Sequence, residues 1–243
     1  MQTSPTLKAH GRGRGLGLAL AAAFLMNATT YAATVDFATF NQTASGSPFS
    51  FTNNGGVSGT INYNTAVQVN FNFTAATGLG TGDRLANVTI TNTGGVSTFT
   101  PAASAGGFLV QPLNNLPTIK FTEVSTGKNL LTMTFTGDIL GRVGAAVGSI
   151  QGDDTTGQVV QYTSDYIAFG APGNSYVLSL GAISPGLSLG AGGFLNSFTA
   201  NIGGQFRGSI PTIPEPTSII MLGTGVALPL WALRRHRKQQ TKA

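Results

Sequence analysis

Residues 67–74, Val-Gln-Val-Asn-Phe-Asn-Phe-Thr, decide the fold class of this chain, because apolar and polar side chains alternate along them. Successive side chains of a β-strand point to opposite faces, so the pattern predicts a strand with one apolar face and one wet face. The same alternation recurs at residues 87–91, 119–122 and 131–135. A Gly-bearing connection, Ser125-Thr126-Gly127-Lys128, joins the last two segments and predicts a β-hairpin.

Further short segments between Gly-, Asn- and Ser-rich turns complete an all-β pattern. They are Thr34 to Phe40, Thr60 to Tyr63, Phe108 to Gln111, Val159 to Tyr162, Tyr176 to Leu180 and Phe198 to Ile202. No segment between them shows a helical period over ten or more residues. We therefore predict one β-sandwich or jelly-roll-like domain over residues 33–210. Residues 102–107 and 182–193 are predicted surface connections, and residues 203–212 a short tether.

The net charge of residues 33–210, which we call the body, differs from that of the whole chain. The chain carries a net charge of +5, but eight of its thirteen basic residues lie near the two ends. Between residues 33 and 210, five basic residues stand against seven acidic ones, a balance of about −2. A nucleic-acid partner requires a basic face, so the composition argues against nucleic-acid binding. The chain contains no cysteine, which excludes disulfides and thiolate metal sites.

Catalytic patterns are scarce in the body. The two histidines, His10 and His236, lie in the terminal segments, so catalysis by a Ser-His-Asp or Cys-His arrangement is excluded for the body, as are imidazole zinc sites. We expect no enzyme activity and no cofactor. One alternative is a secreted hydrolase using two carboxylates. Glu123 is the one glutamate of the body, and its place beside a predicted turn favours an ordinary solvated residue.

Two binding alternatives follow from oxygen-bearing and aromatic side chains. The loop Gly152-Asp153-Asp154-Thr155-Thr156-Gly157 offers Asp153 and Asp154 as calcium ligands, although a solvated turn explains it more simply. A carbohydrate-binding module would need exposed rings beside amides. The available tyrosines are expected to be half-buried in the core instead; they are Tyr63, Tyr162, Tyr166 and Tyr176.

The amino-terminal residues 1–32 have the pattern of a secretory signal peptide. A basic opening with Lys8, Arg12 and Arg14 precedes the uncharged, mostly apolar stretch Leu16 to Met26. Thr30-Tyr31-Ala32 then places small residues at the two positions that signal peptidase reads. We expect signal peptidase to cut there, so that the mature chain starts at Ala33.

The carboxy-terminal residues 211–243 combine three features in order. Pro214-Glu215-Pro216 precedes an uncharged run over residues 217–233, and a basic cluster follows; it contains Arg234, Arg235, Arg237 and Lys238. As a helix, the run is about 25 Å long at ~1.5 Å per residue, which is short of the ~30 Å hydrocarbon core. Such a span is tolerated if the bilayer thins and the flanking basic side chains snorkel. The basic cluster should stay cytoplasmic, leaving the β-domain outside. A plain membrane anchor without processing is the alternative interpretation.

These three features resemble the PEP-CTERM sorting signal of bacterial exported proteins. The resemblance implies recognition by a membrane-embedded exosortase at Pro214, Glu215 and Pro216. It also implies an inner-membrane intermediate, delivery to the cell surface or extracellular matrix, and a link to extracellular polysaccharide. We therefore expect an exported, non-catalytic structural or exopolysaccharide-associated protein, with a carbohydrate-binding module and a carboxylate-dependent hydrolase as alternatives.

Overall fold

The computed structural model describes residues 33–55, 58–74, 77–92, 101–170 and 172–210 of the 243-residue chain. The predicted signal peptide, the Pro214-Glu215-Pro216 motif, the predicted membrane helix and the basic cluster all lie outside the described residues. Within the described ranges, no helix is both long and apolar enough to cross a membrane.

Strands dominate the described residues, and two short 3-10 turns interrupt them. The strands are β1 (Ala33–Gln42), β2 (Phe49–Asn53), β3 (Gly59–Tyr63), β4 (Val69–Phe73), β5 (Asp83–Thr91), β6 (Ala103–Ala105), β7 (Phe108–Leu113), β8 (Thr118–Glu123), β9 (Asn129–Phe135), β10 (Gly137–Arg142), β11 (Gly148–Asp153), β12 (Val160–Thr163), β13 (Ser175–Ser184) and β14 (Phe198–Ile210). The turns are η2 (Asp154–Thr156) and η3 (Ala191–Gly193). The prediction of an all-β domain is confirmed.

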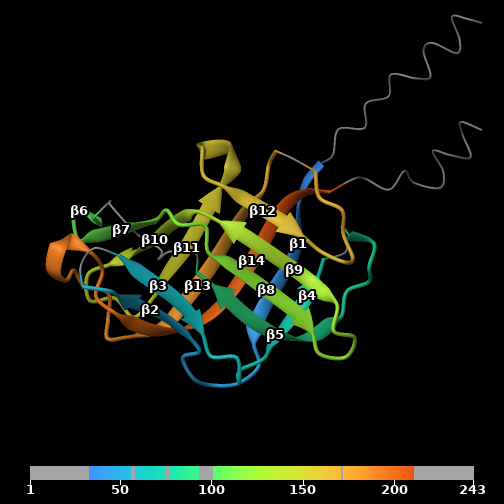
Figure 1. The fold of residues 1–243 in the computed structure, drawn as a ribbon, viewed down its shortest axis with the longest axis horizontal. Helices are drawn as coiled ribbons and strands as arrows, with labels where there is room; N and C mark the ends of the chain where they lie inside the picture. Colours follow the sequence, from blue (N-terminus) through green and yellow to red (C-terminus); the bar gives the residue numbers. More distant parts are fainter. Residues whose placement is uncertain (1–32, 56–57, 75–76, 93–100, 171, 211–243) are drawn as a thin grey trace, which may run out of the picture. The chain divides into compact units, whose positions relative to one another are not determined.

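All the strands belong to one antiparallel hydrogen-bonded sheet (Figure 1). Its main order is β12-β9-β8-β5-β4-β1-β14-β13-β11-β10-β7-β6, and β2 and β3 branch from β14. The predicted hairpin is the β8–β9 pair, in which Ile119 lies opposite Met133. Residues 67–74 contain β4, whose buried Val69, Phe71 and Phe73 alternate with half-buried Asn70 and Asn72, as predicted.

The sheet bends over itself, so that the inner faces of distant strands pack together. The ring of Phe40 on β1 lies 4.8 Å from that of Phe121 on β8, measured between centroids. Phe135 on β9 is equally close to Tyr176 on β13, at 4.8 Å. In Figure 1, β8 and β9 accordingly pass in front of β14 and β13. Burial of aromatic and aliphatic side chains between these two layers stabilises the domain.

A bulge in β1 changes which of its side chains face the core. The register with β14 shifts between Asp36 and Ala38, so that the consecutive residues Phe37 and Ala38 are both fully buried. Past the bulge, Thr39 and Asn41 point to the same outer side as Asp36, although the spacing from Asp36 is odd. A bulge inserts one residue and thereby re-aims the side chains that follow it.

Three predicted loops are wrong. Residues 203–210 continue β14 instead of forming a tether, and residues 182–184 continue β13, with Ile183 buried. Within 102–107, residues 103–105 form β6. The glycines of β14 reflect close packing: a Cβ on Gly204 would lie 2.5 Å from Cε1 of Phe40 and 2.8 Å from Cδ2 of Leu178. Glycine is therefore required there by the core and does not mark a loop.

Candidate functional site

Glu123 is not a solvated surface residue, contrary to the expectation from sequence. Its residue exposure is 6%, and its Oε1 accepts a hydrogen bond from Nη1 of Arg84 at 3.0 Å, which is also an ion pair. Its Oε2 accepts from the hydroxyl of Tyr166 at 2.5 Å and from the hydroxyl of Thr126. The strand position beside a turn was predicted correctly, but the carboxylate is bonded by side chains from β5, from the β8–β9 turn and from the segment after β12.

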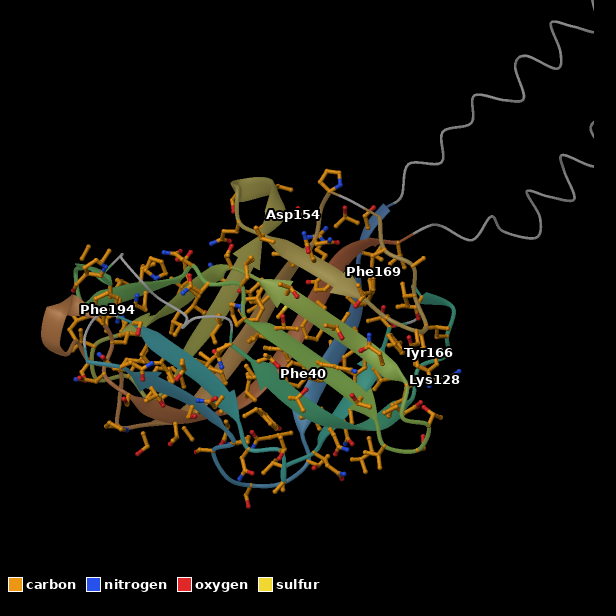
Figure 2. The ribbon with its side chains drawn as sticks, in the orientation of Figure 1. Phe40, Lys128, Asp154, Tyr166, Phe169 and Phe194 are labelled. Carbon is orange, nitrogen blue, oxygen red and sulfur yellow. The ribbon has the colours of Figure 1, made fainter. Side chains whose placement is uncertain are left out.

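Cations flank the ring of Tyr166 on the edge of this cluster. Cζ of Arg84 lies 4.9 Å and Nζ of Lys128 lies 5.4 Å from the ring centroid, and Figure 2 shows Lys128 beside Tyr166. Hydrogen bonds from Thr126 and Tyr166, together with Arg84, lower the pKa of Glu123 despite its burial. A carboxylate held ionised in this way cannot serve as a general acid near neutral pH. The cluster therefore stabilises the fold and is a poor catalytic site.

Asp153 and Asp154, the weak calcium candidates, both hold backbone amides. Oδ1 of Asp153 caps the turn η2 by accepting from the amide of Thr155 at 2.8 Å. Asp154, labelled in Figure 2, accepts from the amides of Gly173 at 2.9 Å and Asn174 at 3.0 Å, and these bonds connect the loop after β11 to the start of β13. Among the described residues, no group of three or more His, Cys, Asp and Glu side chains could hold a metal.

Three of the four tyrosines are too deeply buried to stack on a ligand. Tyr63, Tyr162 and Tyr176 are 8%, 7% and 2% exposed. The hydroxyl of Tyr162 donates to the carbonyl of Ser175 at 2.6 Å, and that of Tyr176 donates to the carbonyl of Thr136 at 3.1 Å. These tyrosines are core residues with polar ends, in the usual manner of buried tyrosine. They are buried more completely than the sequence suggested.

A polar cleft lies on the outer side of the sheet, over β10, β11 and β13. It has a volume of about 480 Å³, and its lining residues are Asp138, Gln151, Gly152, Asp153, Thr156, Gln158, Ser175, Tyr176 and Val177. Asp138, Gln151 and Val177 are aligned across the three strands as direct pairing partners. The cleft thus brings together side chains that are up to 39 residues apart in sequence, counted from Asp138 to Val177.

Asp138 is a carboxyl of this cleft whose protonation equilibrium is shifted. Burial raises the pKa of its carboxyl, and a hydrogen bond from Nε2 of Gln158 to Oδ2, 2.9 Å long, acts in the opposite direction. Asp153 lines the same cleft, two residues along β11 from the partner of Asp138. Sequence reasoning missed Asp138, because a single acid between Gly137 and Ile139 matches no motif.

Two smaller depressions lie on the same side of the sheet, over β13, β14 and β1. One, of about 270 Å³, is lined by Asp36, Ser175, Tyr176, Val177, Gln205 and Arg207. The other, of about 350 Å³, is lined by Asn41, Gln42, Ser179, Gly181, Asn201, Ile202 and Gly203. We call the outward-facing side chains that line these three hollows the polar face. It combines amides, hydroxyls and few charges, which suits hydrogen bonding to a hydroxyl-rich ligand.

An apolar hollow of about 420 Å³ borders the polar face along β7, β10 and β11. Phe108 at its rim is 53% exposed, and the guanidinium carbon of Arg142 lies 4.4 Å from the ring centroid. Leu140 and Val147 also line it. Sequence reasoning did not single out Phe108, whose exposure depends on its position at the start of β7.

Comparisons of the chain with protein-family models, curated proteins and solved structures find no match. The functional assignment therefore rests on the residues and their geometry.

Proposed function

We propose that this chain is an exported cell-surface or extracellular-matrix protein that an exosortase sorts through its PEP-CTERM-like tail. In this proposal the β-domain has a non-catalytic role in association with exopolysaccharide. The observation that carries the proposal is the three-part tail: Pro214-Glu215-Pro216, an uncharged run and a basic cluster, in that order. A secretory-type amino terminus supports the same topology, because both ends would place the domain outside the cytoplasm.

The architecture of the domain supports a passive surface role. We infer a sandwich-like, jelly-roll-related arrangement, in which one continuous antiparallel sheet folds into two packed layers. The outer surface over β10, β11, β13, β14 and β1 is mainly uncharged and polar. Such a coat leaves many hydrogen-bonding groups accessible to a ligand.

Glu123 supports a non-catalytic role as well. It is the one glutamate of the body, and its carboxylate is occupied by Arg84, Tyr166 and Thr126. A hydrolase would need an acid with a raised pKa and a free oxygen aimed at a substrate. Glu123 has a lowered pKa and three partners.

One observation favours the hydrolase alternative and gives it a test. Asp138 and Asp153 line the same cleft, and diagonal neighbours on adjacent strands have Cα atoms about 7–8 Å apart. Their carboxyl groups can therefore come within the separation of roughly 5–10 Å that carboxyl pairs have in glycosidases. If the cleft were catalytic, the purified chain would release reducing ends from polysaccharides, and Asp138→Asn would abolish the release. We expect no release by either protein, because Asp153 is already used to cap η2.

Sorting is tested on the native carboxy terminus. The protein is recovered from the cell surface of its host, and its terminal peptide is identified by mass spectrometry. We expect a terminus near Pro214, and full-length precursor in the inner membrane of cells lacking the exosortase. Surface protein that keeps Lys238 to Ala243 in exosortase-containing cells would overturn the sorting proposal in favour of a plain anchor.

A further inference from the structure

The three hollows of the polar face adjoin one another: two of them share lining residues, and the third lies on the same strands as its neighbour, β1, β13 and β14. Ser175 and Val177 line both the hollow of about 480 Å³ and the one of about 270 Å³. In the register of the sheet, Asp138, Gln151, Val177 and Gln205 form one row across β10, β11, β13 and β14. From β10 to β1 the face spans four strand spacings, about 19 Å at ~4.8 Å each, which is long enough for several sugar units.

Several polar side chains of this face have unused hydrogen-bonding capacity. Within the described residues, the side chains of Gln151, Gln205, Asn41 and Asn201 make no hydrogen bond or ion pair with one another or with other protein groups. Each amide offers two N–H donors and a carbonyl acceptor. They are also held on strands, so a ligand meets them already positioned and loses less entropy on binding.

The charged side chains of the polar face favour neutral hydroxyl-rich polymers over anionic ones. Three carboxylates line its hollows, those of Asp36, Asp138 and Asp153, against one guanidinium, that of Arg207. A polyanion would meet a net negative surface, and like-charge contact opposes binding. Val177, which is 44% exposed, supplies an apolar spot in the middle of the polar row. Together, neutral amides around an apolar centre match the hydroxyls and C–H faces of an uncharged sugar.

We propose that the polar face binds a neutral polysaccharide chain that lies across the strands from β10 to β1. Gln151 and Gln205 hold hydroxyls on either side of Val177, and Asn41 and Asn201 contact the chain farther along. This inference rests on the proposed function and names the polymer class and the surface that would give it an exopolysaccharide-associated role. Binding by this face needs none of the tyrosines that the structure buries in the core.

Affinity electrophoresis of the full chain in detergent tests the proposal. The gels contain soluble neutral glucans, mannans or galactans in one set and polygalacturonate, a polyanion, in the other. We expect retardation by at least one neutral polymer and none by polygalacturonate. The double variant Gln151→Ala/Gln205→Ala should raise the Kd obtained from the retardation roughly tenfold or more, since the hydrogen bonds of both amides beside Val177 are lost.

The matched control is Gln161→Ala, which removes an exposed glutamine from β12, outside the polar face. It should leave retardation unchanged, and far-ultraviolet circular dichroism should show that all variants keep the β-fold. No binding to any neutral polymer, preferential binding of polygalacturonate, or equal loss in Gln161→Ala would overturn the proposal. Carboxy-terminal mass spectrometry reports on sorting separately, so a protein that is sorted but binds no neutral polymer refutes this inference alone.

Discussion

Ala33 is the pairing partner of Ile210 at the end of the β1–β14 ladder, so the two ends of the described domain lie side by side. Ala33 is also the predicted first residue of the mature protein. Three residues separate Ile210 from Pro214, and a fully extended chain bridges that interval in at most about 14 Å. The length of the connection alone therefore keeps Pro214 within about 14 Å of the paired strand end.

Substitution of Glu215 tests the motif without disturbing insertion. Glu215→Ala should block processing, because it removes the central side chain of the triplet and leaves the apolar run and basic cluster intact. The precursor should accumulate in the inner membrane with its domain outside, as measured by protease accessibility and carboxy-terminal mass spectrometry. Gln239→Ala, beyond the basic cluster, is the control and should be processed normally. Unchanged processing of Glu215→Ala would indicate a plain anchor.

Alternation predicted most strands whose inner positions carry large apolar side chains, although β2, with buried Phe49 and Phe51, was missed. It also missed β10 and β11, where some inner positions carry glycine. In β10 and β11 the inward-facing residues include Gly137 and Gly152, both of which pack against the large ring of Tyr176. At these two positions the space in the core is filled by the Tyr176 side chain of β13, so β10 and β11 themselves lack the large apolar residues that would reveal alternation. β14 was truncated in the prediction for the same reason, since Gly204 lies under Phe40. The packing of a glycine against a large ring on another strand cannot be predicted from the sequence around that glycine.

The candidate site was less accessible to sequence reasoning than the fold. Asp138, Gln151 and Gln205 become neighbours because β11 pairs with β13 and β13 with β14, and no local pattern fixes those pairings. Asp36 joins the face through the bulge in β1. Glu123 was placed correctly on a strand, but its burial depends on Arg84 and Tyr166, which lie 39 and 43 residues away.

Gly137 tests the close packing of β10 beneath Tyr176. A Cβ on Gly137 would collide with the Tyr176 hydroxyl and the carbonyl of Gln151, and backbone cannot move aside cheaply. Gly137→Ala should therefore lower the free energy of unfolding by about 3 kcal/mol. Gly82→Ala, where a Cβ would meet nothing within 4 Å, is the matched control and should change it little. Urea denaturation followed by circular dichroism measures both; equal stability of the two variants would contradict the packing.

Substitution of Asp154 tests whether its carboxylate only holds the amides of Gly173 and Asn174 or also binds calcium. Asp154→Ala should destabilise the domain by about 1–2 kcal/mol, because the amides of Gly173 and Asn174 lose their acceptor. Calcium at about 5 mM should leave the Tm of the wild-type chain unchanged, although that concentration would fill even a weak extracellular site. Differential scanning calorimetry with calcium and with a chelator measures this. A calcium-dependent rise in Tm that Asp154→Ala abolishes would establish a metal site.

Glu123 should make the stability of the domain fall in acid. Hydrogen bonds from Thr126 and Tyr166, with the Arg84 ion pair, lower its pKa in the folded state below the ordinary value of 4.5. A depressed carboxyl pKa contributes stability that is fully present above the unfolded-state pKa and is lost as pH falls through the folded-state pKa. The loss attributable to Glu123 should therefore begin below about pH 4.5 and be absent at neutral pH.

Glu123→Gln isolates this contribution. At pH 7 it should lower the free energy of unfolding by about 2 kcal/mol, a value for charge-assisted hydrogen bonds that allows for the partial exposure of Arg84. Between pH 7 and pH 3 it should lose less stability than the wild type, since the titrating group is gone. Tyr166→Phe keeps the ring beside Arg84 and Lys128 but removes one donor, so its effect at pH 7 should be about half as large. Asp83→Asn, at an exposed position on β5, serves as the control. Urea denaturation at both pH values decides the matter: an acid-induced loss as steep in Glu123→Gln as in the wild type would exclude Glu123 as its source.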